Sequence, residues 1–389
     1  MFLTVILAAL ALLSLALNLW QWALAIRFPL HRRAADTSHA PGVTLLKPLK
    51  GCDAETAACL RSWFTQEYAG PVQILFGVAS DTDPVCAVVR QLMAEHPERE
   101  AQLVICRENL GPNAKVSSLA QLEPLARHEI LVVSDADVWV PPDLLSNLAA
   151  PWRDPHTGLV CCFYQLSNAA NLAMRWEALS TNADFWSQVL QAQSLKPIDF
   201  ALGAVMATTR QHLTRIGGYR ALVDYLADDY QLGHQIAAQG GRIVLCPLVV
   251  ECRSAPLRTT DVWLHQLRWA RTVRVCQPVP YFFSILSDAS FWPLLWLACR
   301  PGLLVGAVAG ACVALRLTAA WYCERKLVGR QSRSWWLAPV KDLLQVVVWA
   351  LAFAGNHAVW RGQRLRVTAG GRLLREESTA SSQTGGSTH

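Results

Sequence analysis

The sequence predicts an α/β domain with a mostly parallel sheet, flanked by transmembrane helices at both ends. Two observations carry this prediction. Hydrophobic residues make up 52% of the 389 residues and charged residues 16%, a composition between that of a soluble enzyme and that of a pure transporter. The charges are also segregated along the chain. Residues 2–26 carry none, residues 27–275 alternate apolar and polar stretches, and the chain becomes apolar and Trp-rich again from about residue 279.

The N-terminal segment is typical of a membrane anchor. The uncharged run Phe2–Ile26 is long enough to cross a hydrocarbon core of about 30 Å. It has no basic residue before it and is longer than the apolar part of a signal peptide, so we expect it to be retained. Arg27, His31, Arg32 and Arg33 follow at once, and by the positive-inside rule they place the next domain in the cytoplasm.

The middle of the chain alternates strand-like and helix-like patterns, which indicates βαβ units and a mostly parallel sheet. Ligands bind such sheets at the carboxyl ends of the strands, so polar residues that follow a strand are candidates for a site. The predicted strands are Val43–Leu46, Val72–Val78, Gln102–Cys106, Ile130–Ser134 and Gly158–Leu166, and the predicted helices are Glu55–Phe64, Pro84–Glu95 and Val116–Ala126.

The C-terminal third predicts two or three further membrane segments. Phe291–Leu315 and Trp335–Trp360 are each long enough to span a bilayer, although Arg300 interrupts the first and a Lys-Asp pair interrupts the second. Tyr281–Cys299 is either a third span or a helix at the interface. Basic residues near both ends leave the number of crossings open.

The predicted organisation has five parts. They are an N-terminal anchor (1–26), a juxtamembrane linker (27–42), a cytoplasmic α/β domain (43–278), a C-terminal membrane region (279–360) and a tail (361–389). The tail is basic at first, and its last residues, 378–389, are rich in Ser, Thr and Gly. Such a composition predicts disorder.

Charge and cysteine content argue against two other kinds of protein. A net charge of +6, with Arg mostly near the apolar stretches, suits an anionic membrane surface. Basic and aromatic residues are not interleaved as in single-strand-binding proteins, so nucleic acid is not an expected partner. The 12 cysteines include no C-x-x-C, which argues against zinc sites and a disulfide framework. We expect reduced core thiols.

Two acidic residues follow a predicted buried strand. Ile130–Val133 leads through Ser134 into Asp135 and Asp137, and carboxylates placed there suit a Mg²⁺ or Mn²⁺ ion that neutralises a diphosphate. The D-x-D pattern alone is common by chance, and a second copy occurs at residues 81–83. A polar loop cap is the alternative for either copy, but the strand context favours a metal site at Asp135 and Asp137.

A second acidic pair, Asp228-Asp229, precedes a stretch that is expected to be helical. One interpretation is N-capping, because Asp favours a helix start. The other is a general base, because a like-charged neighbour raises the pKa of a carboxyl towards the working pH. The pair by itself favours capping.

A third motif places His265, Arg268, Trp269 and Arg271 near one face of a helix. An Arg there can bind diphosphate oxygens in a bidentate manner and stabilise a departing nucleotide. The alternative is an amphipathic helix that rests its basic face on anionic lipid. The two interpretations are compatible.

Taken in order, these motifs resemble a known series. The acidic sites at 81–83, 135–137 and 228–229, followed by Arg-Trp, resemble the D, D, D, (Q/R)-x-x-R-W series of GT-A-type membrane glycosyltransferases. Within that group the chain is most similar to the ceramide glucosyltransferase family and its bacterial relatives, which include hopanoid-biosynthesis glycosyltransferases. The resemblance covers about residues 43–275. Further matching motifs are Leu46–Gly51, Phe76–Val78 through Asp83-Pro84, Asn113–Val116 and, more weakly, Trp360-Arg361-Gly362 with the tail after it.

The resemblance implies a GT-A-like, nucleotide-sugar-binding domain and an inverting glycosyltransferase. A hexose such as glucose would pass from a UDP-sugar to a hydroxyl of a membrane lipid of the ceramide type. One alternative is transfer to a hopanoid lipid, for example of N-acetylglucosamine. Another is a non-catalytic polytopic membrane protein with a dead transferase domain.

The resemblance also implies a role for each matching residue. The donor-binding residues would be Lys50, Asp81, Asp83, Lys115, Asp135 and Asp137, of which the last two also hold the metal; the catalytic group would be Asp229 as the base, with Asp228, His265, Arg268 and Trp269. Two positions depart from the family pattern, since His265 replaces Gln or Arg and Ala114 replaces Pro. We also expect Asn168–Gln193, with Trp176, Phe185 and Trp186, on the acceptor side, with core packing as the alternative.

Overall fold

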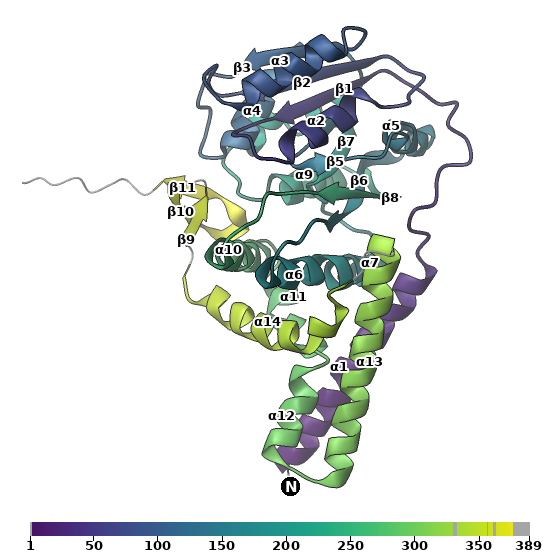
Figure 1. The fold of residues 1–389 in the computed structure, drawn as a ribbon, viewed down its shortest axis with the longest axis vertical. Coiled ribbons are helices and arrows are strands. Elements are labelled where there is room, and N and C mark those ends of the chain that lie inside the picture. Colours follow the sequence, from purple (N-terminus) through teal and green to yellow (C-terminus); the bar gives the residue numbers. More distant parts are fainter. Residues whose placement is uncertain (1, 330–332, 356, 361–362, 376–389) are drawn as a thin grey trace, which may run out of the picture.

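The computed structural model describes residues 2–329, 333–355, 357–360 and 363–375. An α/β domain forms the upper part of the molecule, and long helices extend below it (Figure 1). The domain is built on an eight-stranded sheet. This architecture confirms the predicted fold class.

The sheet is mostly parallel, with the order β3-β2-β1-β4-β7-β6-β8-β5. Strand β7 is antiparallel to both of its neighbours and β5 is antiparallel to β8, whereas the other pairs are parallel. The strands are β1 (Val43–Pro48), β2 (Val72–Val78), β3 (Glu100–Ile105), β4 (Ile130–Ser134), β5 (Val138–Trp139), β6 (Thr157–Leu166), β7 (Val205–Thr209) and β8 (Arg242–Cys252). All five predicted strands are therefore present, two of them with the predicted bounds.

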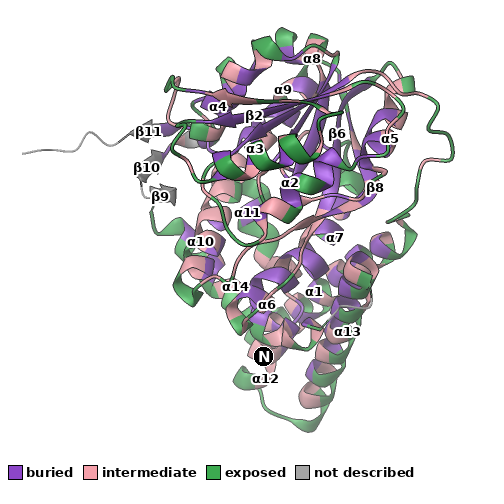
Figure 2. Cartoon of the chain, turned by 45° about the horizontal axis from the view of Figure 1, so that its top comes forward, coloured by how far each residue is buried: buried purple, intermediate pink, exposed green. Residues whose placement is uncertain are grey.

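Helices cover both faces of the sheet, and Figure 2 shows the buried strands between them. Because alternate side chains of a strand point to opposite faces, Leu46 and Leu131 pack in the core with α4 and α9, whereas Leu45 and Val132 pack with α2, α3 and α5. These helices and the short helical turns near them are α2 (Thr56–Phe64), α3 (Val85–Glu95), α4 (Ala114–Leu122), η1 (Glu123–Leu125), α5 (Leu144–Ala149), η2 (Ala150–Arg153), α8 (Arg210–Arg215), η4 (Tyr219–Leu222) and α9 (Asp228–Ala238).

A helical layer forms the base of the domain. It consists of α6 (Leu172–Leu179), the π-helical turn η3 (Ser180–Phe185), α7 (Trp186–Leu195) and α10 (Thr259–Cys276). Single π-turns within a helix are frequent at functional sites.

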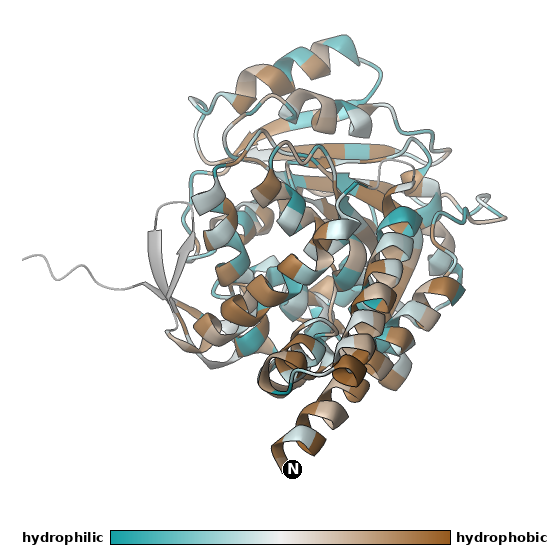
Figure 3. Ribbon diagram, turned by 60° about the horizontal axis from the view of Figure 1, so that its bottom comes forward, coloured by the Kyte–Doolittle hydropathy of each residue, from teal (hydrophilic) through white to brown (hydrophobic). Residues whose placement is uncertain are grey.

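Three helices of the described residues are long and apolar enough to cross a membrane: α1 (Phe2–Arg27), α13 (Leu303–Val328) and the continuous stretch of η7 and α14 (Trp335–Phe353). A bent pair, Pro278–Ser287 (α11 and η5) with α12 (Phe291–Cys299), makes a fourth if it is one span bent by 57°. In Figure 1, α1, α12 and α13 run side by side below the domain, whereas α14 lies crosswise beneath α6 and α10. Figure 3 shows that hydrophobic residues dominate these helices.

Two predicted spans had the wrong bounds. Phe291–Leu315 is not one helix, because α12 ends at Cys299 and α13 begins at Leu303. Proline disfavours helical geometry in the residue before it, and Arg300, which precedes Pro301, is non-helical. The second predicted span, Trp335–Trp360, ends as a helix at Phe353.

A small antiparallel sheet follows the membrane region. It contains β9 (His357–Trp360), β10 (Gln363–Val367) and β11 (Leu373–Arg375), with the short turn η8 (Ala369–Gly371) between the last two. Two of its strands therefore lie in the segment that was predicted as a basic tail. The predicted disorder at 378–389 falls outside the described residues.

Candidate active site

The acidic motifs gather at one edge of the sheet. Strands β2, β1 and β4 are parallel neighbours, so the segments that follow them lie at the same edge. Asp83, after β2, accepts hydrogen bonds from the Gly51 amide at 3.0 Å to each carboxylate oxygen, and one from the Val85 amide at 3.0 Å. It thus joins the loop after β1 to the start of α3.

The two neighbouring donor candidates are held less firmly. Asp81 is exposed and lies 3.9 Å from Arg107, which is also exposed. Lys50 is exposed and directly precedes Gly51, the partner of Asp83. Of the two aspartates at 81 and 83 that are predicted to bind the donor, Asp83 is therefore the one in a fixed position.

Lys115 links two of the predicted acidic sites. It belongs to the first turn of α4, whose N-cap is Asn113. Its Nζ lies 2.7 Å from Asp135 Oδ1 and 3.0 Å from Asp228 Oδ2, with only 12% of the side chain exposed. Burial alone would lower the pKa of this ammonium group, but the two carboxylates raise it above its usual value. The lysine is charged and holds the D-x-D loop beside the start of α9.

Asp137 is the less restrained half of the D-x-D motif. Its carboxylate accepts a hydrogen bond from its own backbone amide, and its side chain reaches solvent. The surrounding protein partly desolvates it and Asp135 lies nearby, and together they raise its pKa to about 6. Since water still reaches the side chain, part of this effect is screened. A bound cation would stabilise the ionised form of a carboxylate in these surroundings.

Lys47 is a site residue that the sequence analysis did not single out. It is fully buried in β1, and its Nζ donates to the Asp135 carbonyl and, at 3.2 Å, to Ser134 Oγ. Burial lowers its pKa to about 8. The available signal was a lysine inside an otherwise apolar strand, where a charge needs a partner.

Asp229 occupies the first turn of α9. Its Oδ1 accepts a hydrogen bond from the Tyr230 amide at 2.8 Å. Burial and the adjacent Asp228 raise its pKa to about 6. A Cβ at residue 203 would lie 2.7 Å from Asp229 Oδ2, so only glycine fits there without displacing the carboxylate.

Neither aspartate is the N-cap residue of α9, but Asp229 still accepts a hydrogen bond from an amide of its first turn. Asp228 and Asp229 are the first two helical residues, and the N-cap position belongs to Ala227, which has no side-chain cap. The two carboxylates instead face Lys115 and the Tyr230 amide.

The Arg-Trp motif lies on α10, at the base of the domain. The Trp269 ring stacks on His265, with centroids 6.0 Å apart, and packs against Phe185 of η3 at 5.4 Å. His265 Nδ1 pairs with the buried Glu177 of α6. Arg268 is half-buried on the same helix. The histidine that departs from the family pattern therefore has a carboxylate partner of its own.

An aromatic row connects this helix with the acidic edge. Phe185 packs against Tyr164 of β6, with centroids 5.7 Å apart. Burial raises the pKa of Tyr164 well above its usual value, and the charges of Asp229 and Asp135 act in the same direction.

The aromatic residues of the predicted acceptor-side element, 168–193, pack against other side chains, and its role towards the acceptor stays a prediction. Phe185 faces the aromatic row, whereas Trp186 is fully buried in the core and Trp176 stacks on Trp263 at 5.9 Å.

The C-terminal segment also reaches this site. The Leu226 amide donates to the Gly371 carbonyl at 2.9 Å, and Gln231 Nε2 donates to the Gly370 carbonyl at 2.9 Å. The Leu373 amide donates to the Asp224 carbonyl at 2.7 Å. Residues 370–373 thus hold the loop that leads into Asp228 and Asp229.

Substitution of Gly371 should weaken this contact. Gly371 has a φ of +81°, and a Cβ would lie 3.3 Å from Cys276 Sγ. Gly240 is a matched control, since its φ is +86° but a Cβ there would meet nothing within 4 Å. We expect both alanine variants to lose about 1–2 kcal/mol of stability, and only Gly371→Ala to lose turnover. Equal turnover for the two variants would show that the C-terminal contact does not support the acidic loop.

Comparison with known proteins places these features in a family. The family model of glycosyl transferase family 21 matches residues 3–373. Ceramide glucosyltransferase 1 of Caenorhabditis elegans is 25% identical over 253 residues, which cover 63% of this chain and 52% of that protein. The ceramide glucosyltransferase of Candida albicans is 36% identical over 117 residues, which cover 27% of this chain and 22% of that protein.

A bacterial relative matches to a similar extent. An N-acetylglucosaminyltransferase of Rhizobium leguminosarum bv. viciae is 25% identical over 254 residues, or 61% of this chain and 57% of that protein. The chain therefore spans only part, at most 57%, of the length of these three relatives.

A solved structure shares the fold. The mannosyltransferase PcManGT from Pyrobaculum calidifontis, in complex with GDP-Man and Mn²⁺, superposes with a TM-score of 0.57 at 20% identity, covering 90% of this chain and 99% of that chain. The fold is thus GT-A-like. The family match runs from the first helix into the last described strand, and the chain belongs to glycosyl transferase family 21.

Proposed function

We propose that this enzyme transfers a hexose from a UDP-sugar to a hydroxyl of a ceramide-like membrane lipid, with inversion at the anomeric carbon. One observation carries the proposal most directly. Lys115 draws Asp135 of the D-x-D motif and Asp228 of the second acidic pair together, so the proposed donor site and the proposed base share one edge of the sheet. That edge belongs to a domain whose base packs on apolar helices.

The donor would bind along the edge formed after β1, β2 and β4. Asp83 would contact the uridine, with Lys50 nearby and Lys115 towards the diphosphate. Asp135 and Asp137 would hold a Mg²⁺ or Mn²⁺ ion. The described residues contain no group of three or more His, Cys, Asp or Glu side chains that could hold a metal, which fits an ion bound through two carboxylates, phosphate oxygens and water. Such an ion supplies positive charge to the leaving diphosphate.

The acceptor step would be a single displacement. Asp229 would accept the proton of the lipid hydroxyl while that oxygen attacks the anomeric carbon. The bond between this carbon and the diphosphate oxygen breaks, and its electron pair stays with the nucleoside diphosphate. Arg268 would stabilise the charge that develops there, and Trp269 would close the donor site. An α-linked donor would give a β-glycoside.

The membrane helices, the relatives and the basic residues after the first span suggest the acceptor and the orientation. A domain that packs on apolar helices is positioned to receive an amphiphile at the bilayer surface, and the two relatives named ceramide glucosyltransferase favour ceramide. The Rhizobium relative favours N-acetylglucosamine transfer as a second candidate. For that transfer we propose a hopanoid lipid as the acceptor, as the resemblance implies. We place the α/β domain in the cytoplasm because basic residues follow the first span.

Sealed membrane vesicles from an expressing host would test function and orientation together. UDP-glucose does not cross bilayers, so added donor reaches only the outer face. We expect glucosylceramide, detected by mass spectrometry, in inverted vesicles that contain ceramide and Mg²⁺ or Mn²⁺, and little in right-side-out vesicles. Product only in right-side-out vesicles would reverse the orientation. Absence of any glycolipid, with UDP-glucose or UDP-N-acetylglucosamine, would favour the non-catalytic alternative.

A further inference from the structure

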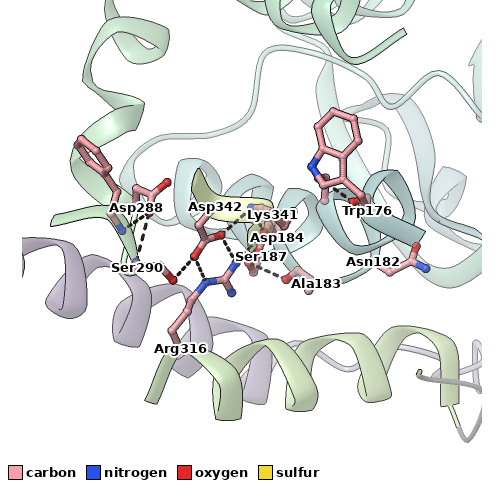
Figure 4. Close-up of polar contacts among 12 residues, drawn as sticks. Trp176, Asn182, Ala183, Asp184, Ser187, Asp288, Ser290, Arg316, Lys341 and Asp342 are labelled. Atoms are coloured by element: carbon pink, nitrogen blue, oxygen red, sulfur yellow. Dashed lines mark hydrogen bonds and ion pairs between the residues drawn. The ribbon is translucent and has the colours of Figure 1, made fainter. Parts of the chain in front are cut away.

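Four charged side chains meet where the α/β domain joins the membrane helices (Figure 4). Asp184 Oδ2 lies 2.9 Å from Arg316 Nη2 and 2.5 Å from Lys341 Nζ. Asp342 Oδ1 lies 2.8 Å from Arg316 Nη2 and 3.0 Å from Lys341 Nζ. We call Asp184, Arg316, Lys341 and Asp342 the junction cluster.

The junction cluster is buried and balanced in charge. Its side chains are 10% exposed for Asp184, 4% for Arg316, 8% for Lys341 and 3% for Asp342. Arg316 binds Asp342 through two nitrogens, and Ser290 Oγ donates to Asp342 Oδ2 at 2.6 Å. Ionisable residues in membrane segments are costly and usually serve a function.

The α/β domain and two of the membrane helices contribute residues to the junction cluster. Asp184 belongs to η3 at the base of the α/β domain, Arg316 to the upright helix α13, and Lys341 and Asp342 to the crosswise helix α14. The cluster therefore fixes the domain to two membrane helices that run in different directions.

The first span also turns a polar face towards this place. Ser14, Asn18 and Gln21 are buried on one side of the otherwise apolar α1. A small cavity brings Asn18 and Trp22 beside Arg316. Asn18 Oδ1 and Trp22 Nε1 are buried without a hydrogen-bond partner among the described residues. Polar groups of α1, η3 and α13 therefore lie close together around this cavity.

The two ends of α13 have different surroundings. Before it, Leu303 is 95% and Leu304 77% exposed, as expected for side chains that face lipid. After it, Cys323 and Leu327 are buried in the core of the α/β domain. The junction cluster lies between the lipid-facing and the domain-facing parts of the helix.

The cluster is linked to the candidate active site through one residue. Asp184 directly precedes Phe185, which packs against Trp269 of the Arg-Trp motif and Tyr164 of the aromatic row. A shift of η3 relative to α13 and α14 would therefore move the wall of the site relative to the bilayer.

From these contacts we infer that the junction cluster sets the height and orientation of the transfer site over the membrane. Asp184 is then a positioning residue, which acts through η3 and Phe185. The inference rests on the function proposed above, because it assumes that the acceptor hydroxyl belongs to a lipid in the bilayer. A site held at the wrong height would still bind donor but would meet that hydroxyl less often.

The test must loosen the junction without leaving an unpaired buried charge, which by itself is strongly destabilising. Asp184→Asn with Lys341→Met removes one charge of each sign and keeps the Arg316–Asp342 pair. Asp199→Asn with Lys196→Met makes the same two changes at an exposed pair 3.0 Å apart, and is the matched control. Arg316→Met with Asp342→Asn removes the other balanced pair and replaces the first variant if that variant does not fold.

Two ceramide acceptors, one in micelles and one in vesicles, distinguish a misplaced site from a general loss of catalytic activity. Hexanoyl ceramide in detergent micelles can approach the site freely, whereas palmitoyl ceramide in phosphatidylcholine–phosphatidylglycerol vesicles is fixed in the bilayer. We expect the junction variant to retain the micellar activity of the control and to lose roughly tenfold or more of its activity in vesicles, since small misplacements of reactants have effects of this size or larger.

Other outcomes would contradict the inference. Equal losses with both acceptors, or no loss with either, would overturn the positioning role. UDP binding and the thermal unfolding midpoint confirm that the variants are folded. If the unmodified enzyme glycosylates neither acceptor, the proposed lipid transfer fails, and this inference fails with it.

Discussion

Asp229→Asn is expected to reduce turnover by roughly 10²–10⁴-fold, the usual contribution of a general base. Asp229 Oδ1 accepts a hydrogen bond from the Tyr230 amide at 2.8 Å. The side-chain oxygen of asparagine can accept the same bond, so the first turn of α9 should persist. Asparagine cannot take a proton from the acceptor. The measurement is kcat with saturating UDP-sugar and lipid, together with the dissociation constant of UDP, which should change little.

The pH profile identifies which carboxylate acts. The pKa of Asp229 is raised to about 6, and a base must be deprotonated, so activity should fall as the pH drops below about 6. Asp228→Asn removes a neighbouring negative charge that raises this pKa, and the acidic limb should move to lower pH but persist. Asp224→Asn, at an exposed position in the preceding loop, is the control and should leave the profile unchanged. A larger loss for Asp228→Asn than for Asp229→Asn would assign the base to Asp228.

Asp137→Ala is expected to abolish measurable transfer while the protein stays folded. A metal-bound site contributes several kcal/mol of charge stabilisation to a leaving group, which corresponds to roughly a hundredfold or more in rate. The carboxylate reaches solvent and bonds its own backbone amide, so its loss should not disturb the packing of β4. Binding of the UDP-sugar, measured by calorimetry with and without Mn²⁺, should lose its dependence on the metal.

A control at the opposite edge of the sheet separates metal binding from a general charge effect. Asp154 lies just before β6 and forms an exposed pair with Arg242 at 2.5 Å. Asp154→Ala removes the same charge from the same domain and should leave both turnover and metal dependence unchanged. Full activity of Asp137→Ala in detergent would remove the D-x-D motif from the proposed mechanism.

These predictions depend on residues that the sequence singled out but whose contacts it did not show. The buried strand Ile130–Ser134 followed by acidic residues was visible, because strand periodicity and a polar strand end are local features of the chain. The ion pairs of Lys115 with Asp135 and Asp228 were not visible, since these partners lie 20 and 113 positions after it in the sequence. The sequence placed Lys115 only near the nucleotide.

The membrane region shows a different limit. Arg300 and the Lys341-Asp342 pair were recognised as interruptions of apolar runs. Arg300 does mark a real break, because Pro301 prevents its helical geometry. Lys341 and Asp342, by contrast, remain inside a continuous helix, where Arg316 and Asp184 neutralise them.

The sequence by itself determined the α/β class, the order of the acidic and Arg-Trp motifs and the presence of apolar helices at both ends, all of which depend on local periodicity and composition. Only the tertiary structure decided which charges meet, where the spans begin and end, and that the segment after the last membrane helix returns to the loop before Asp228. The physical reason is that a buried charge, or a buried backbone N–H or C=O group, needs an ion-pair or hydrogen-bond partner. That partner is chosen by the three-dimensional packing of the elements and not by distance along the chain.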